Sequence, residues 1–125
     1  ETLRDVLSRM AEHGFADGAL RPAFGMAETC SGITWSSGLL FHTITEKDIK
    51  FISLGGPIPG AELRIVDENG EVLNADEEGF LQLRGPSVMS GYYNNPEVNL
   101  KSMRPDGWFQ KRLRGLNRAL FGRAS

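Results

Sequence analysis

An aromatic residue, a glycine and an acid stand close together in the segment Phe24–Thr34, where an extended run gives way to small residues. Glycine lets a backbone approach a flat base or a phosphate closely, and an aromatic ring can lie against a purine. A carboxylate such as that of Glu28 can hold a magnesium ion that also binds phosphates. These residues suit a nucleotide site, and they equally suit an ordinary turn with a buried Phe and a solvated Glu.

Glycines, prolines and aromatic residues recur in three blocks downstream of this loop. The blocks are Gly55–Asp67, which opens with Gly-Gly-Pro-Ile-Pro-Gly, then Gly79–Glu97, which contains Gly-Pro and Gly-Tyr-Tyr, and finally Asp106–Phe109. Together with the loop, their order and spacing resemble the AMP-forming adenylating enzymes: acyl-CoA synthetases, fatty-acyl-AMP ligases, luciferases and the adenylation domains of nonribosomal peptide and polyketide synthases. The resemblance covers roughly residues 1–109. Within it, Cys30–Ile33 looks most like adenylation domains of hybrid polyketide and peptide synthases.

The resemblance implies that the loop residues bind the nucleotide. They are Phe24, Gly25, Met26, Ala27 and Glu28. In this family the aromatic residue lies against adenine, the glycine leaves room near base and carboxylate, and the acid is linked to magnesium. Ala27 stands where many members carry a hydroxyl near the α-phosphate. The implied cofactors are ATP and Mg²⁺, and the implied reaction converts a small carboxylic acid to acyl-AMP. The intact enzyme passes the acyl group to coenzyme A or to the phosphopantetheine of a carrier protein.

The sequence departs from the family after Trp108-Phe109. There the family continues with Thr-Gly-Asp, whose acid holds the ribose hydroxyls, whereas this chain has Gln110-Lys111-Arg112. The family's upstream phosphate loop and substrate-pocket helix, and its C-terminal lid with a catalytic lysine, have no counterpart in these 125 residues. We therefore expect part of an adenylating enzyme that has no catalytic residue and is inactive alone. Two alternatives remain: a non-enzymatic interaction module derived from this family, and a basic-tailed nucleic-acid binder.

Charge and composition limit the other functions. All 16 acidic residues precede residue 110, whereas residues 110–125 hold Lys and Arg but no acid. A basic tail can attract nucleic acid, but we interpret it as a divergent terminus, because the resemblance ends at Phe109. A single cysteine, Cys30, excludes an internal disulfide, and with His13 and His42 it offers too few ligands for zinc. No apolar run approaches the ~20 residues of a membrane span, and we see no leader, so we expect a cytoplasmic protein without a membrane partner.

The first half of the chain predicts a helix and then a strand that ends at the loop. Apolar residues at helical spacing predict a helix over residues 2–13 with one buried stripe; they are Leu3, Val6, Leu7 and Met10. Residues 19–24 lead into a strand, which places the loop where open α/β sheets hold ligands. We expect Glu28 to be reachable from solvent and to face a groove.

The second half predicts mainly strands. Glu62–Val66 alternates, Asp67–Gly70 contains the Asn-Gly hairpin signal, and Glu71–Leu73 is the expected return strand. Another strand is expected over Gly79–Arg84, a short helix from Pro96, and a last helix carrying Leu113, Leu116 and Leu120. Tyr92 and Tyr93 are expected to cover the small barrel-like unit that these strands form.

These elements predict an α+β fold in three parts. Residues 1–54 form the end of an α/β subdomain that carries the nucleotide loop. Residues 55–109 form a β-rich, barrel-like subdomain, and residues 110–125 form a divergent basic tail.

Overall fold

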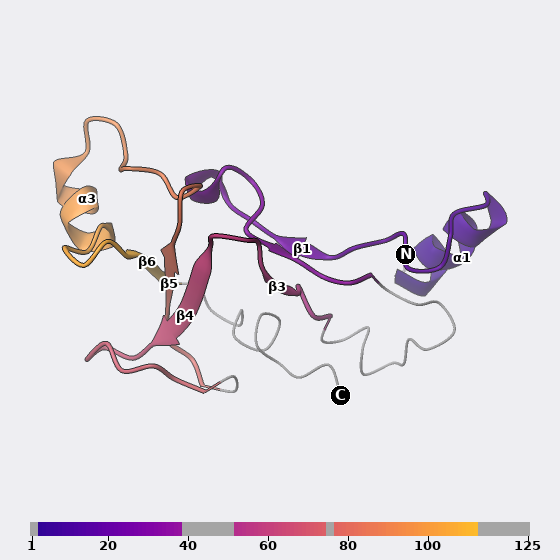
Figure 1. Cartoon of the computed structure of the whole chain (residues 1–125), viewed down its shortest axis with the longest axis horizontal. Coiled ribbons are helices and arrows are strands. Elements are labelled where there is room, and N and C mark those ends of the chain that lie inside the picture. The colour runs from indigo at the N-terminus through magenta and orange to yellow at the C-terminus, as the bar shows by residue number, and fades with distance from the viewer. Residues whose placement is uncertain (1–2, 39–51, 75–76, 113–125) are drawn as a thin grey trace.

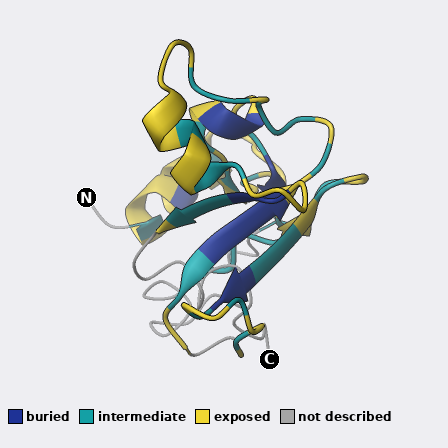
Figure 2. Ribbon diagram, turned by 90° about the vertical axis from the view of Figure 1, so that its left-hand side faces the viewer, coloured by how far each residue is buried: buried dark blue, intermediate teal, exposed yellow. Residues whose placement is uncertain are grey.

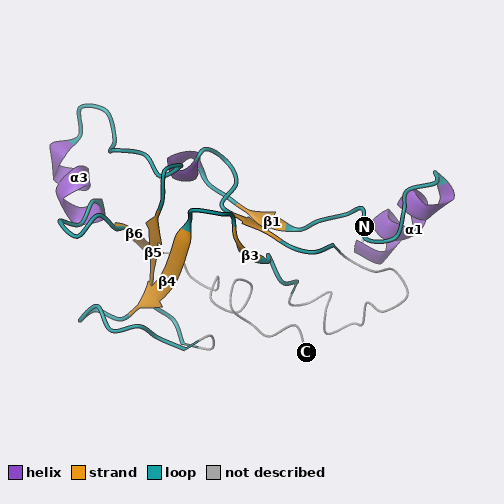
Figure 3. Ribbon diagram, in the orientation of Figure 1, coloured by secondary structure: helices purple, strands orange, loops and turns teal. Residues whose placement is uncertain are grey.

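The computed structural model describes residues 3–38, 52–74 and 77–112. Within these ranges, the chain contains helices and two small antiparallel sheets joined by long loops (Figures 1 and 3). The elements are α1 (Leu3–Glu12), β1 (Ala23–Phe24), the 3₁₀ turn η1 (Ala27–Thr29), β2 (Thr34–Trp35), β3 (Gly56–Pro57), β4 (Glu62–Val66), β5 (Phe80–Arg84), α3 (Pro96–Ser102) and β6 (Phe109–Arg112). Helix and sheet are thus both present, as the predicted α+β class requires.

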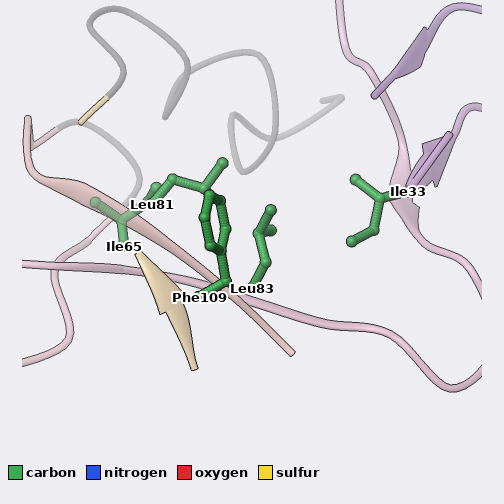
Figure 4. Close-up of a cluster of buried hydrophobic side chains, with 5 residues drawn as sticks. All are labelled: Ile33, Ile65, Leu81, Leu83 and Phe109. Carbon is green, nitrogen blue, oxygen red and sulfur yellow. The ribbon is translucent and has the colours of Figure 1, made fainter. Parts of the chain in front are cut away.

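The larger sheet has the order β4-β5-β6, and both strand pairs are antiparallel. Its inner face carries a core of apolar side chains, and Ile33, which directly precedes β2, joins this core (Figure 4). The core consists of Ile33, Ile65, Leu81, Leu83 and Phe109. The register places Ile65 opposite Leu81, and Leu83 opposite Phe109. Because alternate residues of a strand share a face, these four side chains lie on the same side of the sheet. Figure 2 shows the buried residues concentrated along these strands.

The prediction of a barrel-like unit is wrong in one respect. The described strands form an open sheet in which β4 and β6 lie at opposite edges of β5, so they do not close into a barrel. Closure requires every edge strand to find a partner, and these two strands do not pair with each other.

The smaller sheet has the order β1-β2-β3, and each of its strands is two residues long. A side chain reinforces this short ladder: the Thr34 hydroxyl accepts a hydrogen bond from the Phe24 amide (3.1 Å) and donates one to the Leu54 carbonyl (2.7 Å). The loop that contains η1 therefore follows a strand, as predicted. All strand pairs in the described parts of the chain are antiparallel, so an α/β subdomain over residues 1–54 stays a prediction.

Helices α1 and α3 confirm the local sequence signals. In α1, Leu7 is buried, whereas Leu3 and Met10 are half-buried and Val6 is exposed, so the predicted stripe is only partly covered. α3 begins at Pro96, and the Asn95 side chain accepts a hydrogen bond from the Val98 amide as its N-cap. The predicted last helix, with Leu113, Leu116 and Leu120, lies outside the described residues. No helix in the described ranges is long and apolar enough to cross a membrane.

The predicted hairpin turn at Asp67–Gly70 is confirmed, but the return strand is not. The Asp67 carboxylate accepts hydrogen bonds from the amides of Glu71 (2.9 Å) and Asn69 (2.8 Å), and these bonds lower its pKa. After the turn, the chain makes one isolated bridge from Val72 to Val66. Glu71 and Val72 are exposed, and Leu73 is the one residue of Glu71–Leu73 that packs against the core.

The sheet extends beyond the boundary predicted at residue 109. β6 continues to Arg112, with Gln110 opposite Gln82, and Lys111 opposite Leu81. Backbone pairing depends little on side-chain identity, so the strand tolerates basic residues that no longer resemble the family. The first three residues of the predicted tail therefore belong to the fold. Residues 113–125 lie outside the described ranges.

Candidate functional site

The loop after β1 closes on itself through Thr29. This side chain is fully buried, and its hydroxyl donates to the Met26 carbonyl (3.1 Å) and accepts from the Met26 amide (3.3 Å). The η1 turn then ends at Cys30 and Ser31, which both have left-handed backbone conformations, with φ of 53° and 79°. Thr29 was not among the predicted site residues, although it shapes the loop that contains them.

Gly25 is required by this closed shape. A Cβ atom at this position would lie 1.1 Å from the Ser31 carbonyl oxygen and 2.8 Å from the Cα of Gly32. Any side chain would therefore force the loop open. Folding alone explains the glycine, whether or not the backbone here also approaches a nucleotide.

The other predicted loop residues differ in their surroundings. Phe24 and Met26 are half-buried and pack against the apolar core, whereas Gly25 and Ala27 are exposed. Glu28 is only 8% exposed. The expectation that Glu28 is reachable from solvent is therefore wrong.

Three contacts from distant parts of the chain bury Glu28. The Tyr92 hydroxyl donates to its Oε1 (2.6 Å), and the Lys111 ammonium donates to the same oxygen (2.5 Å). The backbone carbonyl of Glu28 accepts from the Met89 amide (2.8 Å). Glu28 thus connects the loop to the segment before α3 and to strand β6.

These contacts stabilise the charged form of Glu28. The hydrogen bond from Lys111, followed by that from Tyr92, lowers the pKa of Glu28 from 4.5 to about 2, although burial opposes the shift. The same bond to Glu28 raises the pKa of Tyr92 from 10.0 to about 12. At neutral pH the group is therefore a carboxylate bound by a neutral phenol and an ammonium.

The two tyrosines expected to cover the β unit behave differently. Tyr92 packs against the core and is held through its backbone by Asn99, which accepts from its amide (2.7 Å) and donates to its carbonyl (2.9 Å). Tyr93 is 99% exposed, so the expectation is wrong for this residue. Tyr93 lies in the turn that leads to α3, where its side chain faces solvent.

Sequence reasoning missed Lys111 and Tyr92 as partners of Glu28. Lys111 follows Phe109 by two residues on β6, and Phe109 is fully buried. That spacing puts both side chains on the inner face of the sheet. The alternation could have indicated an inward lysine, but it could not have identified an acid 83 residues away.

The residues present do not fit the magnesium ion that the family resemblance implies. Mg²⁺ requires octahedral oxygen ligands and is usually held by one or two carboxylates together with phosphates. No group of three or more His, Cys, Asp or Glu residues in the described ranges could hold a metal ion. At Glu28, a lysine ammonium and a phenol already bind Oε1 of a carboxylate that is mostly buried. The arrangement therefore favours the Lys111 ammonium over Mg²⁺ as the cation bound to Glu28.

Comparison with known proteins identifies relatives of this loop and its surroundings. The family model described as AMP-binding enzyme matches residues 2–93. The nonribosomal peptide synthetase acyN of Ascocoryne sarcoides is 37% identical over 88% of this chain, and microperfuranone synthase of Emericella nidulans is 38% identical over 84%. The chain spans only 12% and 11% of the lengths of these two curated relatives.

Solved structures of adenylation domains also resemble this chain. The structure of McyG A-PCP complexed with phenylalanyl-adenylate is 48% identical, has a TM-score of 0.78, and is matched over 87% of this chain and 19% of its own. The adenylation domain of a keto acid-selecting NRPS module bound to keto acyl adenylate is 32% identical, with a TM-score of 0.74 over 86% of this chain and 24% of its own. From its loop sequence, its fold and these matches, the chain belongs to the AMP-binding enzyme family and corresponds to a segment of an adenylation domain.

Proposed function

We propose that this chain is the segment of an adenylation domain that carries the nucleotide loop, and that the intact enzyme activates a small carboxylic acid as acyl-AMP. The observation that carries the proposal is the match to the AMP-binding enzyme family over residues 2–93, which includes the whole loop. ATP is the proposed cosubstrate, and coenzyme A or a carrier-protein phosphopantetheine is the proposed acceptor.

The loop geometry supports a role in positioning a nucleotide. Gly25 and Ala27 are exposed and have small side chains or none, and Phe24 is half-buried beside them. Exposed backbone next to a partly exposed ring suits contact with a flat base. The internal bonds of Thr29 fix the shape of this surface before any ligand arrives. We propose that adenine lies against Phe24 and Gly25.

Titration with AMP tests this role in the whole chain. We expect backbone amide chemical shifts to change at residues 24–28 and to remain constant in α3. Ala27→Leu should weaken the effect, because the new side chain covers the exposed loop surface, whereas Tyr93→Leu, at a side chain that is 99% exposed, should not. An oligonucleotide serves as the comparison ligand. Shift changes confined to another region, or produced equally by the oligonucleotide, would contradict the proposed role.

We also propose that the chain does not catalyse adenylation by itself. Where the family continues with Thr-Gly-Asp, this chain has Gln110-Lys111-Arg112. Transition-state stabilisation depends on several charged groups acting together, so the loop alone cannot supply it. We expect no acid-dependent exchange of pyrophosphate into ATP above a protein-free blank with fatty, aryl, keto or amino acids. Exchange with any of these acids that disappears on heating the protein would disprove this part of the proposal.

A further inference from the structure

The ion pair between Lys111 and Glu28 joins the loop to the edge strand of the larger sheet. The two residues are 83 positions apart, and their charged atoms lie 2.5 Å apart. Lys111 reaches Glu28 from the inner face of β6, opposite Leu81 and two residues after Phe109. The strand register therefore fixes where the lysine side chain begins, and the core packing of Phe109 holds that register.

The chain offers a second lysine–glutamate pair for comparison. Lys101 and Glu97 lie one turn apart on α3, and their charged atoms are 2.8 Å apart. Their side chains are 72% and 79% exposed, so water and salt screen the pair. In the loop pair the side-chain exposures are 39% for Lys111 and 9% for Glu28. The Glu28 carboxylate is thus mostly removed from water, and Lys111 and Tyr92 replace its hydration.

We propose that the Lys111 ammonium is the resident cation of Glu28 and excludes a divalent metal from this carboxylate. An ammonium satisfies the charge of a carboxylate with directed hydrogen bonds, and it is tethered, so it does not dissociate into solvent. Both donors bind Oε1, so a metal ion would have to shed part of its own hydration to bind the other oxygen of a carboxylate that is mostly removed from water and already neutralised by Lys111. The inference deepens the proposed function, because it makes this loop independent of Mg²⁺.

Manganese broadening of NMR signals tests the inference without nucleotide, so its outcome does not depend on the proposed function. Mn²⁺ is the probe, added as the chloride to the whole chain with side-chain carboxyl carbons labelled. In the wild type we expect the exposed acids, such as Glu68 and Glu97, to broaden first, while the Glu28 signal keeps its intensity. In Lys111→Met, which removes the charge but keeps most of the stem, Glu28 should broaden at a several-fold lower Mn²⁺ concentration than in the wild type.

Two further variants separate the local charge from general effects. Lys101→Met removes an exposed lysine from the comparison pair and should leave the response of Glu28 unchanged. Lys111→Arg restores a cation and should protect Glu28 as lysine does. If Lys111→Met fails to fold, Lys111→Gln takes its place. Broadening of Glu28 together with Glu68 in the wild type would overturn the inference, as would an unbroadened Glu28 in a folded variant that has lost the ammonium.

Discussion

The sheet β4-β5-β6 and the loop after β1 are held together by different kinds of interaction. The sheet pairs five residues of β4 with five of β5, and it buries aliphatic and aromatic side chains on one face. The loop follows a two-residue strand, and its shape depends on the Thr29 hydroxyl, the Glu28 carboxylate, Gly25 and a few backbone hydrogen bonds. Apolar burial is distributed over many atoms, whereas each polar contact in the loop depends on a single partner. The sheet should therefore supply most of the stability, and the loop most of the sensitivity to pH and to small changes in shape.

The largest expected effect is in the sheet. Phe109 is fully buried, so Phe109→Ala should lower the free energy of unfolding by about 3–5 kcal/mol through lost burial and a cavity. Tyr93→Ala, at a position 99% exposed, should change it by less than about 0.5 kcal/mol. Urea denaturation followed by tryptophan fluorescence measures both. Similar losses in the two variants would show that the β4-β5-β6 core does not dominate stability.

In the loop, the fit of the backbone should affect stability more than the amount of apolar surface that is buried. Gly25→Ala places a Cβ against the Ser31 carbonyl, so it should cost roughly 1–3 kcal/mol and shift the amide signals of the loop. Gly56→Ala is the matched control, because a Cβ there meets no atom within 4 Å. Thermal unfolding and amide spectra distinguish the two. Equal stabilities would mean that the loop opens without cost.

The pH dependence of stability should come partly from Glu28. Its folded pKa of about 2 lies below the ordinary 4.5, so the stabilisation is complete above about pH 4.5 and is lost as pH falls toward 2. Glu28→Gln should lower the free energy of unfolding at neutral pH by about 1–2 kcal/mol, a range reduced for screening of the half-exposed Lys111. The difference between wild type and variant should shrink in acid.

Denaturation of both proteins across this pH range is the measurement. Glu97→Gln, which breaks the exposed pair with Lys101, serves as the control and should have little effect. A wild-type advantage that persists unchanged to about pH 2 would contradict the assigned pKa.

The contrast between the two regions also explains what the sequence could predict. Alternation in Glu62–Val66, the Asn-Gly turn and Pro96 are local signals, and each corresponds to an observed strand, turn or helix start. The strands β2 and β3 carry no such signal, and the Thr34 hydroxyl of β2 is bonded to the Leu54 carbonyl, 20 residues away. Short strands of this kind depend on the tertiary structure rather than on a local pattern.

The predicted family was correct, whereas the predicted exposure of Glu28 was wrong. Family resemblance identified the loop, and family membership is confirmed. It also suggested an exposed Glu28 ready for magnesium, whereas the partners that bury it lie 64 and 83 residues away. Lys111 lies in the stretch where the resemblance ends, so the family pattern could not have predicted its contact.

The smallest expected effect concerns the Tyr92 hydroxyl. Tyr92→Phe removes the bond to Glu28 but keeps the ring against the core, so it should cost about 1 kcal/mol at neutral pH. Because the folded pKa of Tyr92 is about 12 and the ordinary value is 10.0, this stabilisation is present below pH 10 and is lost as pH rises toward 12. Tyr93→Phe, with an exposed ring, should have no comparable effect. Tyr92→Phe and Glu28→Gln both change the same hydrogen bond. Their losses of stability should therefore not add in the double variant. Unfolding is measured for the wild type, the two single variants and the double variant. Strictly additive losses would mean that the phenol does not stabilise the carboxylate, and that Lys111 is the side chain that holds the Glu28 carboxylate.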